Sequence, residues 1–340
     1  QKHEVINVLM TMIYDENDSN PAILTGKTVG VIGYGDMGQA FALNMRDSGI
    51  TVLVSAHNED ENTVAHTHLM SIASAAEVVR RAQIIVVTLP DETMTQVYIE
   101  EISPQLQRGH TLIFTSAYNV AFGYIEPPPF IDVGLVSPRM TGTRVRELYL
   151  NGAGAQSFVA VGQDASRSAW ETVLAIAQTA GALRAGAVEI HFEQEAQLSL
   201  FIQQAIIPAF HHMMVTAAGL LMRSGYPAEA ALPDLYLSGK FYDYLERARE
   251  NGLLHAIQEG NMTGQYASLS RLNRFSELKL ERLMEVTLEE IRRGDFAREW
   301  SREYADGCPR LNRLVKTQEA IDMWDWEQQT IELLGGGDFS

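Results

Sequence analysis

The segment that most constrains the fold is a buried-strand run, Thr28–Ile32, that passes directly into Gly33-Tyr34-Gly35-Asp36-Met37-Gly38. In this G-x-G-x-x-G pattern the first glycine permits a tight turn, the second lets a phosphate approach the backbone, and the third lets the following helix pack on the strand. A second apolar strand, Thr51–Ser55, closes a strand–helix–strand unit. The segment therefore predicts a dinucleotide site at the N-terminus of a helix over 37–48. The alternative is a glycine-rich turn kept only for packing.

Composition limits the class of protein. The chain has 340 residues, 46% of them hydrophobic, which is enough to bury one or two cores and predicts two domains. A net charge of −17 makes nucleic acid and anionic membranes unfavourable partners. The single cysteine, Cys308, fits a reducing compartment. We find no signal-peptide pattern and no uninterrupted apolar run of the roughly 18 residues that span a membrane, and we expect a cytoplasmic protein.

Beyond the first unit, helical segments continue to alternate with buried strands. This alternation is typical of a doubly wound parallel sheet, in which ligands bind at the carboxyl ends of the strands. Helices are predicted over 71–81, 93–102 and 165–180, and strands over 83–89, 111–114, 132–136 and 157–161.

From Glu193 onward the strand signals vanish and helical patterns dominate. Helices are predicted over 194–222, 227–250, 278–292 and 296–304, with a frayed tail at Gly335-Gly336-Gly337. The predicted domains are an N-terminal extension (1–11), a Rossmann domain (12–185), an all-helical domain (186–330) and a flexible tail (331–340).

Several short segments together resemble one family, the short-class (class I) ketol-acid reductoisomerases, from Met12 onward. The segments are Tyr14-Asp15-Glu16-Asn17-Asp18, Ile32-Gly33-Tyr34-Gly35, Leu89-Pro90-Asp91-Glu92, Gln163-Asp164-Ala165-Ser166 and Gly294-Asp295-Phe296-Ala297-Arg298-Glu299-Trp300. The resemblance implies an NAD(P)H-binding Rossmann domain and a knotted helical C-terminal domain. It also implies a homodimer whose active sites draw residues from both subunits.

The chain departs from this family where the resemblance implies ligands for two Mg²⁺ ions. At the two first-helix positions it has Ser199 and Gln203, and at the two second-helix positions it has Asp234 and Ser238. One carboxylate among neutral oxygens is a poor site for Mg²⁺. We therefore expect no magnesium, and no alkyl migration, which needs a polarised carbonyl.

Other site positions have changed as well. The family's loop histidine is Ser116 here, its lysine is Arg139, and its substrate-contacting serine is Asn261. Arg139 follows a strand and is predicted to bind a substrate carboxylate or to polarise an electrophile; the alternative is a surface salt bridge. Ser116, Tyr118 and Asn119 end another strand, with Tyr118 a candidate proton donor; the alternative is that they only shape the loop.

Asp234 is predicted to act as a general acid if burial raises its pKa. It can equally be a helix N-terminal residue favoured by the macrodipole. The predicted catalytic residues are thus Ser116, Tyr118, Arg139 and Asp234. The predicted substrate-binding residues are Asn119, Ser199, Gln203, Ser238 and Asn261.

The cofactor contacts are predicted in three places: the fingerprint (Gly33, Tyr34, Gly35, Asp36, Met37, Gly38), the end of the second strand (His57, Asn58, Glu59) and the matched segment Leu89-Pro90-Asp91. The second of these continues into Asp60 and Glu61. The three carboxylates of Glu59, Asp60 and Glu61 would repel a 2′-phosphate. In contrast, a carboxylate here can accept hydrogen bonds from free ribose hydroxyls. This favours NADH over NADPH, although His57 at the family's arginine position leaves NADPH open.

These observations lead to the hypothesis of a metal-independent NAD(P)H-dependent reductase of a small C=N or C=O substrate, without ketol-acid reductoisomerase activity. Imine reduction ranks above ketone reduction because an iminium carbon is electrophilic without a metal. The alternatives are a non-catalytic dinucleotide-binding protein and a regulatory or partner subunit.

Overall fold

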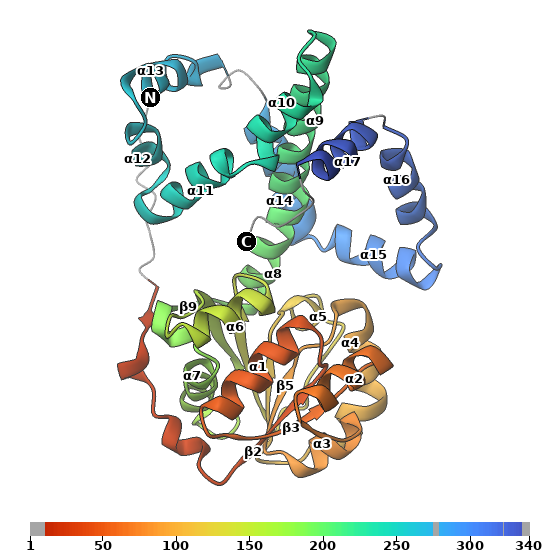
Figure 1. Ribbon diagram of the computed structural model, residues 1–340. Helices are drawn as coiled ribbons and strands as arrows, with labels where there is room; N and C mark the ends of the chain where they lie inside the picture. Colours follow the sequence, from red (N-terminus) through yellow and green to blue (C-terminus); the bar gives the residue numbers. More distant parts are fainter. Residues whose placement is uncertain (1–10, 275–278, 322, 335–340) are drawn as a thin grey trace. The chain divides into compact units, whose positions relative to one another are not determined.

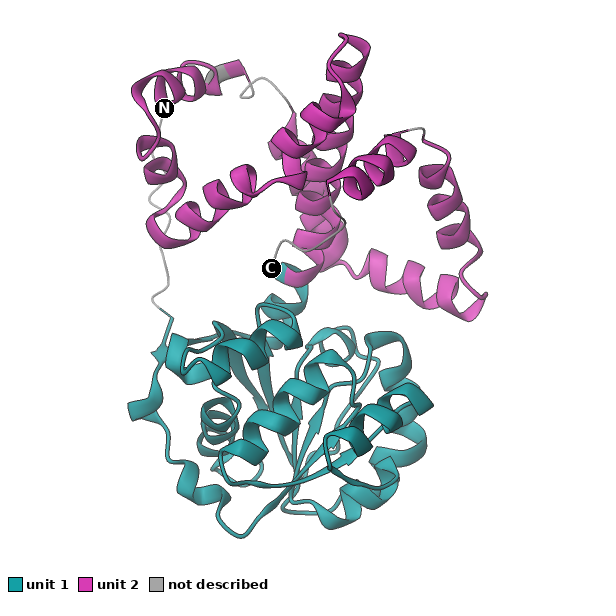
Figure 2. Cartoon of the chain, viewed as in Figure 1, with its two compact units in different colours: residues 1–198 teal, residues 199–340 magenta. Residues whose placement is uncertain are grey.

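The computed structural model of the protein describes residues 11–274, 279–321 and 323–334. It divides into two compact units, Gln1–Leu198 and Ser199–Ser340 (Figure 2). The first is a Rossmann-like α/β domain and the second is helical, so the predicted fold class is confirmed. Most of the predicted extension and tail, and the frayed segment at Gly335-Gly336-Gly337, lie outside the described residues.

A nine-stranded sheet forms the core of the first unit, in the order β1-β9-β8-β7-β6-β5-β2-β3-β4 (Figure 1). The strands from β7 to β4 in this order run parallel. The other edge is mixed, because β8 is antiparallel to β7 and β1 is antiparallel to β9. The strands are β1 (Ile13–Tyr14), β2 (Thr28–Ile32), β3 (Thr51–Ser55), β4 (Ser71–Ile72), β5 (Ile84–Val87), β6 (Thr111–Phe114), β7 (Asp132–Pro138), β8 (Ser157–Gln163) and β9 (Ala187–Glu189).

Helices cover both faces of this sheet (Figure 1). Phe41 and Ile176 pack with Val31 on one face, while Val78 and Met94 join a cluster on the other. Because both faces are buried, the strands are continuous apolar runs. The helices of this unit are α1 (Asp36–Asp47), α2 (Glu59–Thr67), α3 (Ala75–Arg81), α4 (Asp91–Val97), α5 (Tyr118–Ala121), α6 (Gly142–Leu150) and α7 (Ala169–Thr179).

Three helix boundaries differ from the predictions. The helix predicted over 71–81 begins only at Ala75, because residues 71 and 72 pair with β3 as β4 and the Ser74 hydroxyl caps the helix. The helix predicted over 93–102 begins at Asp91 and ends in a π-helical turn, Tyr98–Ile102. The helix predicted over 165–180 begins at Ala169.

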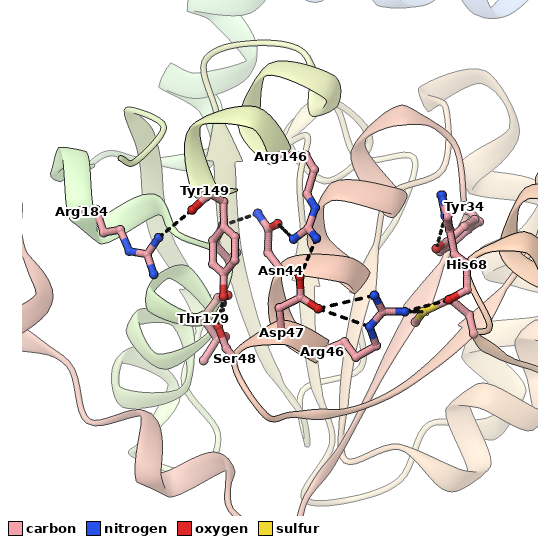
Figure 3. A network of polar contacts seen from close by, with 12 residues as sticks. Tyr34, Asn44, Arg46, Asp47, Ser48, His68, Arg146, Tyr149, Thr179 and Arg184 are labelled. Atoms are coloured by element: carbon pink, nitrogen blue, oxygen red, sulfur yellow. Dashed lines mark hydrogen bonds and ion pairs between the residues drawn. The ribbon is translucent and has the colours of Figure 1, made fainter. Parts of the chain in front are cut away.

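A polar network fastens α6 to α1 and to the end of α7 (Figure 3). The buried Asn44 side chain donates to the Ala180 carbonyl at 3.0 Å and accepts from Arg146 Nη1 at 2.7 Å. Arg146 also pairs with Asp47 at 2.5 Å. Burial raises the pKa of Asp47, but Arg146 outweighs burial and holds that pKa below its usual value. The network anchors α6 beside the helix that carries the glycine fingerprint.

The chain leaves the sheet through α8 (Phe192–Phe201), and no strand occurs among the residues described after it. A π-helical turn, Ile202–Ile206, connects α8 to α9. The helices that follow are α9 (Ile207–Arg223), α10 (Ala228–Leu232), α11 (Gly239–Asn251), α12 (Leu253–Gln258), α13 (Met262–Leu269), α14 (Leu280–Arg292), α15 (Asp295–Ala305), α16 (Pro309–Glu319) and α17 (Met323–Leu333).

The single helix predicted over 227–250 is wrong, since the chain breaks within it. After α10 and a π-helical turn, Pro233–Leu237, Ser238 adopts an extended conformation and α11 begins at Gly239. The Ser238 hydroxyl accepts the Lys240 N–H at 3.5 Å. A serine in this position starts a new helix because it satisfies one of the first free N–H groups.

In the described part of the chain, one continuous helix, Phe192–Arg223, is long and apolar enough to cross a membrane by length and composition alone. The sequence analysis predicted no membrane-spanning segment, because polar residues interrupt the apolar run. Only 6% of the most apolar window is buried within this chain. One such helix is weak evidence for a membrane span.

Candidate functional site

The glycine fingerprint forms the tight strand-to-helix turn that the sequence predicts. Gly33 has φ +95°, which favours glycine. A Cβ on Gly38 would lie 2.1 Å from the Gly33 carbonyl oxygen, so no other residue fits without moving the backbone. Gly35 begins α1 with no side-chain cap, which leaves the first-turn N–H groups for an anion. This cradle fits the pyrophosphate of a dinucleotide.

Two fingerprint side chains are engaged within the protein. The buried Tyr34 hydroxyl lies 3.1 Å from His68 Nδ1. The Asp36 carboxylate accepts the Gly142 N–H at 2.5 Å, and the Thr143 N–H and hydroxyl both at 2.7 Å, at the start of α6. The Tyr34 N–H donates to the Glu61 carboxylate at 2.6 Å, so the predicted cofactor role of Asp36 rests on its backbone N–H group and that of Tyr34 stays a prediction.

The loop after β3 carries the other predicted adenosine-side contacts. His57, Asn58 and Glu59 are all exposed. The Asn58 side chain caps α2 by accepting the Glu61 N–H at 2.9 Å. The loop therefore has a defined conformation, set by the cap, next to the fingerprint.

Polar side chains gather where β5 and β6 end. Leu89 is buried, Pro90 directly precedes α4, and the Asn119 amide donates to the Asp91 carbonyl at 3.0 Å. The Ser116 hydroxyl bonds the Asp91 carboxylate. Burial is the main cause that raises the pKa of Asp91 to about 6, the neighbouring Glu195 raises it further, and Ser116 opposes both. Asp91 is thus protonated more readily than an ordinary aspartate.

A buried ion pair lies at the end of β7. Arg139 Nη1 is 2.7 Å from Glu195 Oε1 on α8, and the Glu195 side chain is only 3% exposed. Glu195 also accepts the Ser137 hydroxyl at 3.0 Å and the Ala117 N–H at 3.1 Å. Arg139 stacks over the Phe158 ring at 4.6 Å. The sequence interpretation placed Arg139 here but missed Glu195, whose partner lies 56 residues earlier in the chain.

Tyr118 lies next to this cluster. Its ring stacks on Tyr124 at 6.2 Å, and its buried hydroxyl has no hydrogen-bond partner among the described residues. Burial raises the pKa of Tyr118 above its usual value. Such a hydroxyl keeps its proton at neutral pH.

The second unit contains the other predicted residues. Ser199 lies on α8 and Gln203 in the π-helical turn that follows. The Asp234 carboxylate pairs with Lys240 at 2.8 Å and is 69% exposed. The Asn261 side chain caps α13 by accepting the Gly264 N–H at 2.8 Å. Among the described residues, no three or more His, Cys, Asp or Glu side chains are grouped so that they could hold a metal ion.

The fold and the fingerprint cradle define a Rossmann-type dinucleotide-binding protein with a second, helical unit. Two family models match it: acetohydroxy acid isomeroreductase, NADPH-binding domain, over residues 23–186, and ketol-acid reductoisomerase, C-terminal domain, over residues 192–334. The chain therefore belongs to the ketol-acid reductoisomerase family.

Relatives named ketol-acid reductoisomerase (NADP(+)) match nearly the whole chain. The protein from Methanothermobacter thermautotrophicus is 34% identical, covering 95% of this chain and 98% of its own. The protein from Sulfurisphaera tokodaii is 33% identical, covering 91% and 93%. The solved structure of an NADH-preferring ketol-acid reductoisomerase from an uncultured archaeon is 27% identical, with a TM-score of 0.88 over 95% of this chain and 99% of that one.

These similarities overturn the functional hypothesis drawn from the sequence. A metal-independent imine or ketone reductase, a non-catalytic binding protein and a partner subunit are all contradicted by 33–34% identity to named ketol-acid reductoisomerases across both domains. The hypothesis gave a few substituted positions more weight than the similarity of the whole chain.

Proposed function

We propose that the protein is a ketol-acid reductoisomerase that converts an acetohydroxy acid by isomerisation and NAD(P)H-dependent reduction. The observation that carries this proposal is the identity of 34% to a relative of that name over 95% of the chain. The match of both domain models supports it, because the two together cover residues 23–186 and 192–334.

When bound, a nicotinamide dinucleotide would supply the hydride that reduces the carbonyl carbon of the substrate. The uncapped N-terminus of α1 and the close approach of Gly33 to Gly38 support binding of its pyrophosphate there. NADH and NADPH are both compatible with the family, and we favour NADH because Glu59, Asp60 and Glu61 follow β3.

Arg139 is proposed to bind the substrate carboxylate. Its side chain is 28% exposed, and Glu195 holds it at the end of β7, where ligands bind in open α/β sheets. A guanidinium fork matches a carboxylate in geometry and charge. Glu195 then acts as a positioning residue that fixes both the fork and, through Ala117, the loop with Ser116 and Tyr118.

The proton that completes reduction is proposed to come from Tyr118 or from Ser116, which bonds Asp91. The unpartnered Tyr118 hydroxyl and the raised pKa of Asp91, about 6, support these assignments. Asp234 remains a prediction, as do the substrate-binding roles of Asn119, Ser199, Gln203, Ser238 and Asn261. The Lys240 ion pair favours a structural role for Asp234.

The Mg²⁺ that the family resemblance implies does not fit the four positions this chain offers. Ser199, Gln203 and Ser238 supply neutral oxygens, and the one carboxylate, Asp234, already pairs with Lys240. Mg²⁺ prefers carboxylate oxygens and gives up its waters reluctantly. We therefore derive no catalytic step through a metal at these residues.

We also propose a homodimer with shared active sites, located in the cytoplasm. The exposed apolar surface of the α8–α9 helix supports a second copy as its cover, with Ile202, Ile207 and Phe210 all more than a third exposed. Apolar patches of this kind mark interfaces. The single cysteine supports a reducing compartment. Sedimentation analysis tests the dimer.

The deciding experiment incubates the protein with a 2-aceto-2-hydroxy acid and NADH or NADPH, each with Mg²⁺, with Mn²⁺ or with EDTA. The matched control substrate is the rearranged 3-hydroxy-2-oxo acid, which needs reduction alone. Formation of the dihydroxy acid from the acetohydroxy acid, identified by mass spectrometry, supports the proposal. Reduction of the control alone, or of neither compound, contradicts it.

A further inference from the structure

The Asp36 side chain fastens the fingerprint to the start of α6. Its Oδ2 accepts the Gly142 N–H at 2.5 Å, and its Oδ1 accepts the N–H and the hydroxyl of Thr143 at 2.7 Å. The Thr141 hydroxyl accepts the next N–H, that of Arg144, at 3.4 Å. The first N–H groups of α6 are therefore satisfied partly by a carboxylate from another helix, which lies 106 residues earlier in the chain.

The two backbones also touch at this point. A Cβ on Gly142 would lie 2.6 Å from the Met37 nitrogen, so the start of α6 rests directly on the first turn of α1. Met37 and Met140 pack against the same small cluster, which contains Ala40 and Val145. Neither the first turn of α1 nor the segment that leads into α6 can move without displacing the other.

These contacts have an electrostatic consequence for the proposed pyrophosphate cradle. Asp36 is the first residue of α1, and a free carboxylate there would be an anion at the N-terminus of its own helix. It would compete with the pyrophosphate for the N–H groups and repel it. The hydrogen bonds to Gly142 and Thr143 hold the carboxylate on α6 instead. Binding of a dinucleotide and the ordered start of α6 therefore favour each other.

The same segment carries the guanidinium proposed to bind the substrate carboxylate. Only Met140 and Thr141 separate Arg139 from Gly142. The Arg139 N–H donates to the Gln156 carbonyl at 2.9 Å, which fixes the other end of the segment on β8. Order in residues 139–143 thus determines how firmly Arg139 is placed.

We propose that Asp36 couples the dinucleotide site to Arg139, so that a bound dinucleotide orders residues 139–143 and raises the affinity for the substrate carboxylate. The proposal rests on the proposed function. Asp36 is a positioning residue here, because its carboxylate acts through α6. Linkage requires the reverse effect as well, since the substrate must raise the affinity for the dinucleotide by the same factor.

The first test is hydrogen exchange of the full-length protein, with and without saturating NADH or NADPH, whichever binds more tightly. In the wild type, the dinucleotide is expected to slow exchange in peptides covering residues 139–150 by about fivefold. This is the lower end of the usual range for coupled sites, because Asp36 is exposed. In Asp36→Asn the dinucleotide is expected to change this exchange by less than about twofold.

The second test is a fluorescence titration with the dinucleotide, in Mg²⁺ buffer, with and without the dihydroxy acid. This acid is the reduced product, so it cannot accept hydride and no turnover occurs. It is expected to tighten dinucleotide binding about fivefold in the wild type and less than about twofold in Asp36→Asn. Thr143→Val, which removes one donor and keeps the backbone N–H, is expected to give about threefold or less. It also serves if Asp36→Asn fails to fold, as judged by circular dichroism.

The matched control is Asp47→Asn, at the other end of α1. Asp47 also bonds α6, through Arg146 at 2.5 Å, but it lies away from the fingerprint. This variant is expected to lose stability and to keep the wild-type response in both tests. An equal loss of response in Asp47→Asn and Asp36→Asn would overturn the proposal, since the effect would then be general loosening of α6.

A wild-type response in folded Asp36→Asn would also overturn it. If the dinucleotide slows exchange through Asp36 but the protein fails the isomeroreductase assay, the proposed function is refuted and the link to residues 139–143 stands. If an active isomeroreductase shows no such change in exchange, the role of Asp36 is refuted and the function stands.

Discussion

The Glu195–Arg139 pair offers the sharpest test of the site, because one carboxylate fastens three elements. Glu195→Gln removes the negative charge. It also replaces one carboxylate oxygen with an NH₂ group, which then faces a donor that bonds an oxygen in the wild type: the Ala117 N–H, the Ser137 hydroxyl or the Arg139 guanidinium. Breaking a buried ion pair costs roughly 3–5 kcal/mol. Arg139 keeps 28% exposure, so the lower end applies, about 3 kcal/mol.

The assay is a double-mutant cycle on the free energy of unfolding in urea, with Glu195→Gln, Arg139→Met and the double variant. Because each single change leaves a partner uncompensated, we expect the double variant to cost less than the sum by about 1.5 kcal/mol or more. The 3 kcal/mol loss in Glu195→Gln corresponds to a melting temperature roughly 6–12 °C lower. A coupling energy below about 0.5 kcal/mol would refute the reasoning, since that is the size of an exposed pair.

The matched control is the pair Arg144 and Glu147, whose nitrogen and oxygen lie 3.0 Å apart but whose side chains are 51% and 52% exposed. The same cycle there is expected to give less than about 1 kcal/mol. In the isomeroreductase assay, Glu195→Gln is expected to raise KM for the substrate more than it lowers kcat, as a positioning residue for Arg139 would. A change in kcat alone would assign Glu195 a direct role instead.

Three further predictions follow from the same unit. Gly38→Ala places a Cβ 2.1 Å from the Gly33 carbonyl oxygen and should weaken NADH binding about tenfold or more, measured by fluorescence titration; unchanged affinity would contradict the close approach. Asn44→Ala leaves the Ala180 carbonyl unpaired and should cost about 1–3 kcal/mol in urea unfolding, whereas a neutral result would mean that water replaces the amide. Asp91 has a folded-state pKa of about 6 against an ordinary 3.8, so the folded protein binds more protons in that window. Its contribution to stability should therefore fall as pH rises from about 4 to about 6, by at most about 3 kcal/mol, and Asp91→Asn should remove this part of the pH dependence of unfolding.

Features that depend on a short stretch of chain were predictable. The fingerprint turn follows from the steric demands of Gly33 and Gly38, and the buried strands follow from their apolar runs. The two-residue strand β4 could not be predicted in this way, because its pairing with β3 outweighs local propensity. The break at Ser238 carries a local signal, a serine before a glycine within a helical pattern, but apolar periodicity obscured it.

Contacts between distant parts of the chain were not predictable in this way. Glu195 is one of two acidic residues in the first turn of a helix, and only the fold brings it to Arg139. The predicted function failed for a related reason. Substitutions at positions such as Ser199 and Ser238 were given more weight than the family resemblance, which the sequence already showed and which identity over the whole chain confirms.

The hydrogen bonds between the Asp36 carboxylate and the start of α6 limit how this protein can be re-engineered. Asp36 belongs to the glycine fingerprint, yet its carboxylate holds Gly142 and Thr143, more than a hundred residues later. A Cβ on Gly142 would lie 2.2 Å from the Asp36 carbonyl oxygen, so neither position varies freely without the other. A fingerprint transplanted from another enzyme would bring new phosphate contacts and release α6 in the same step. The unit suited to grafting is therefore the turn together with its distant glycine.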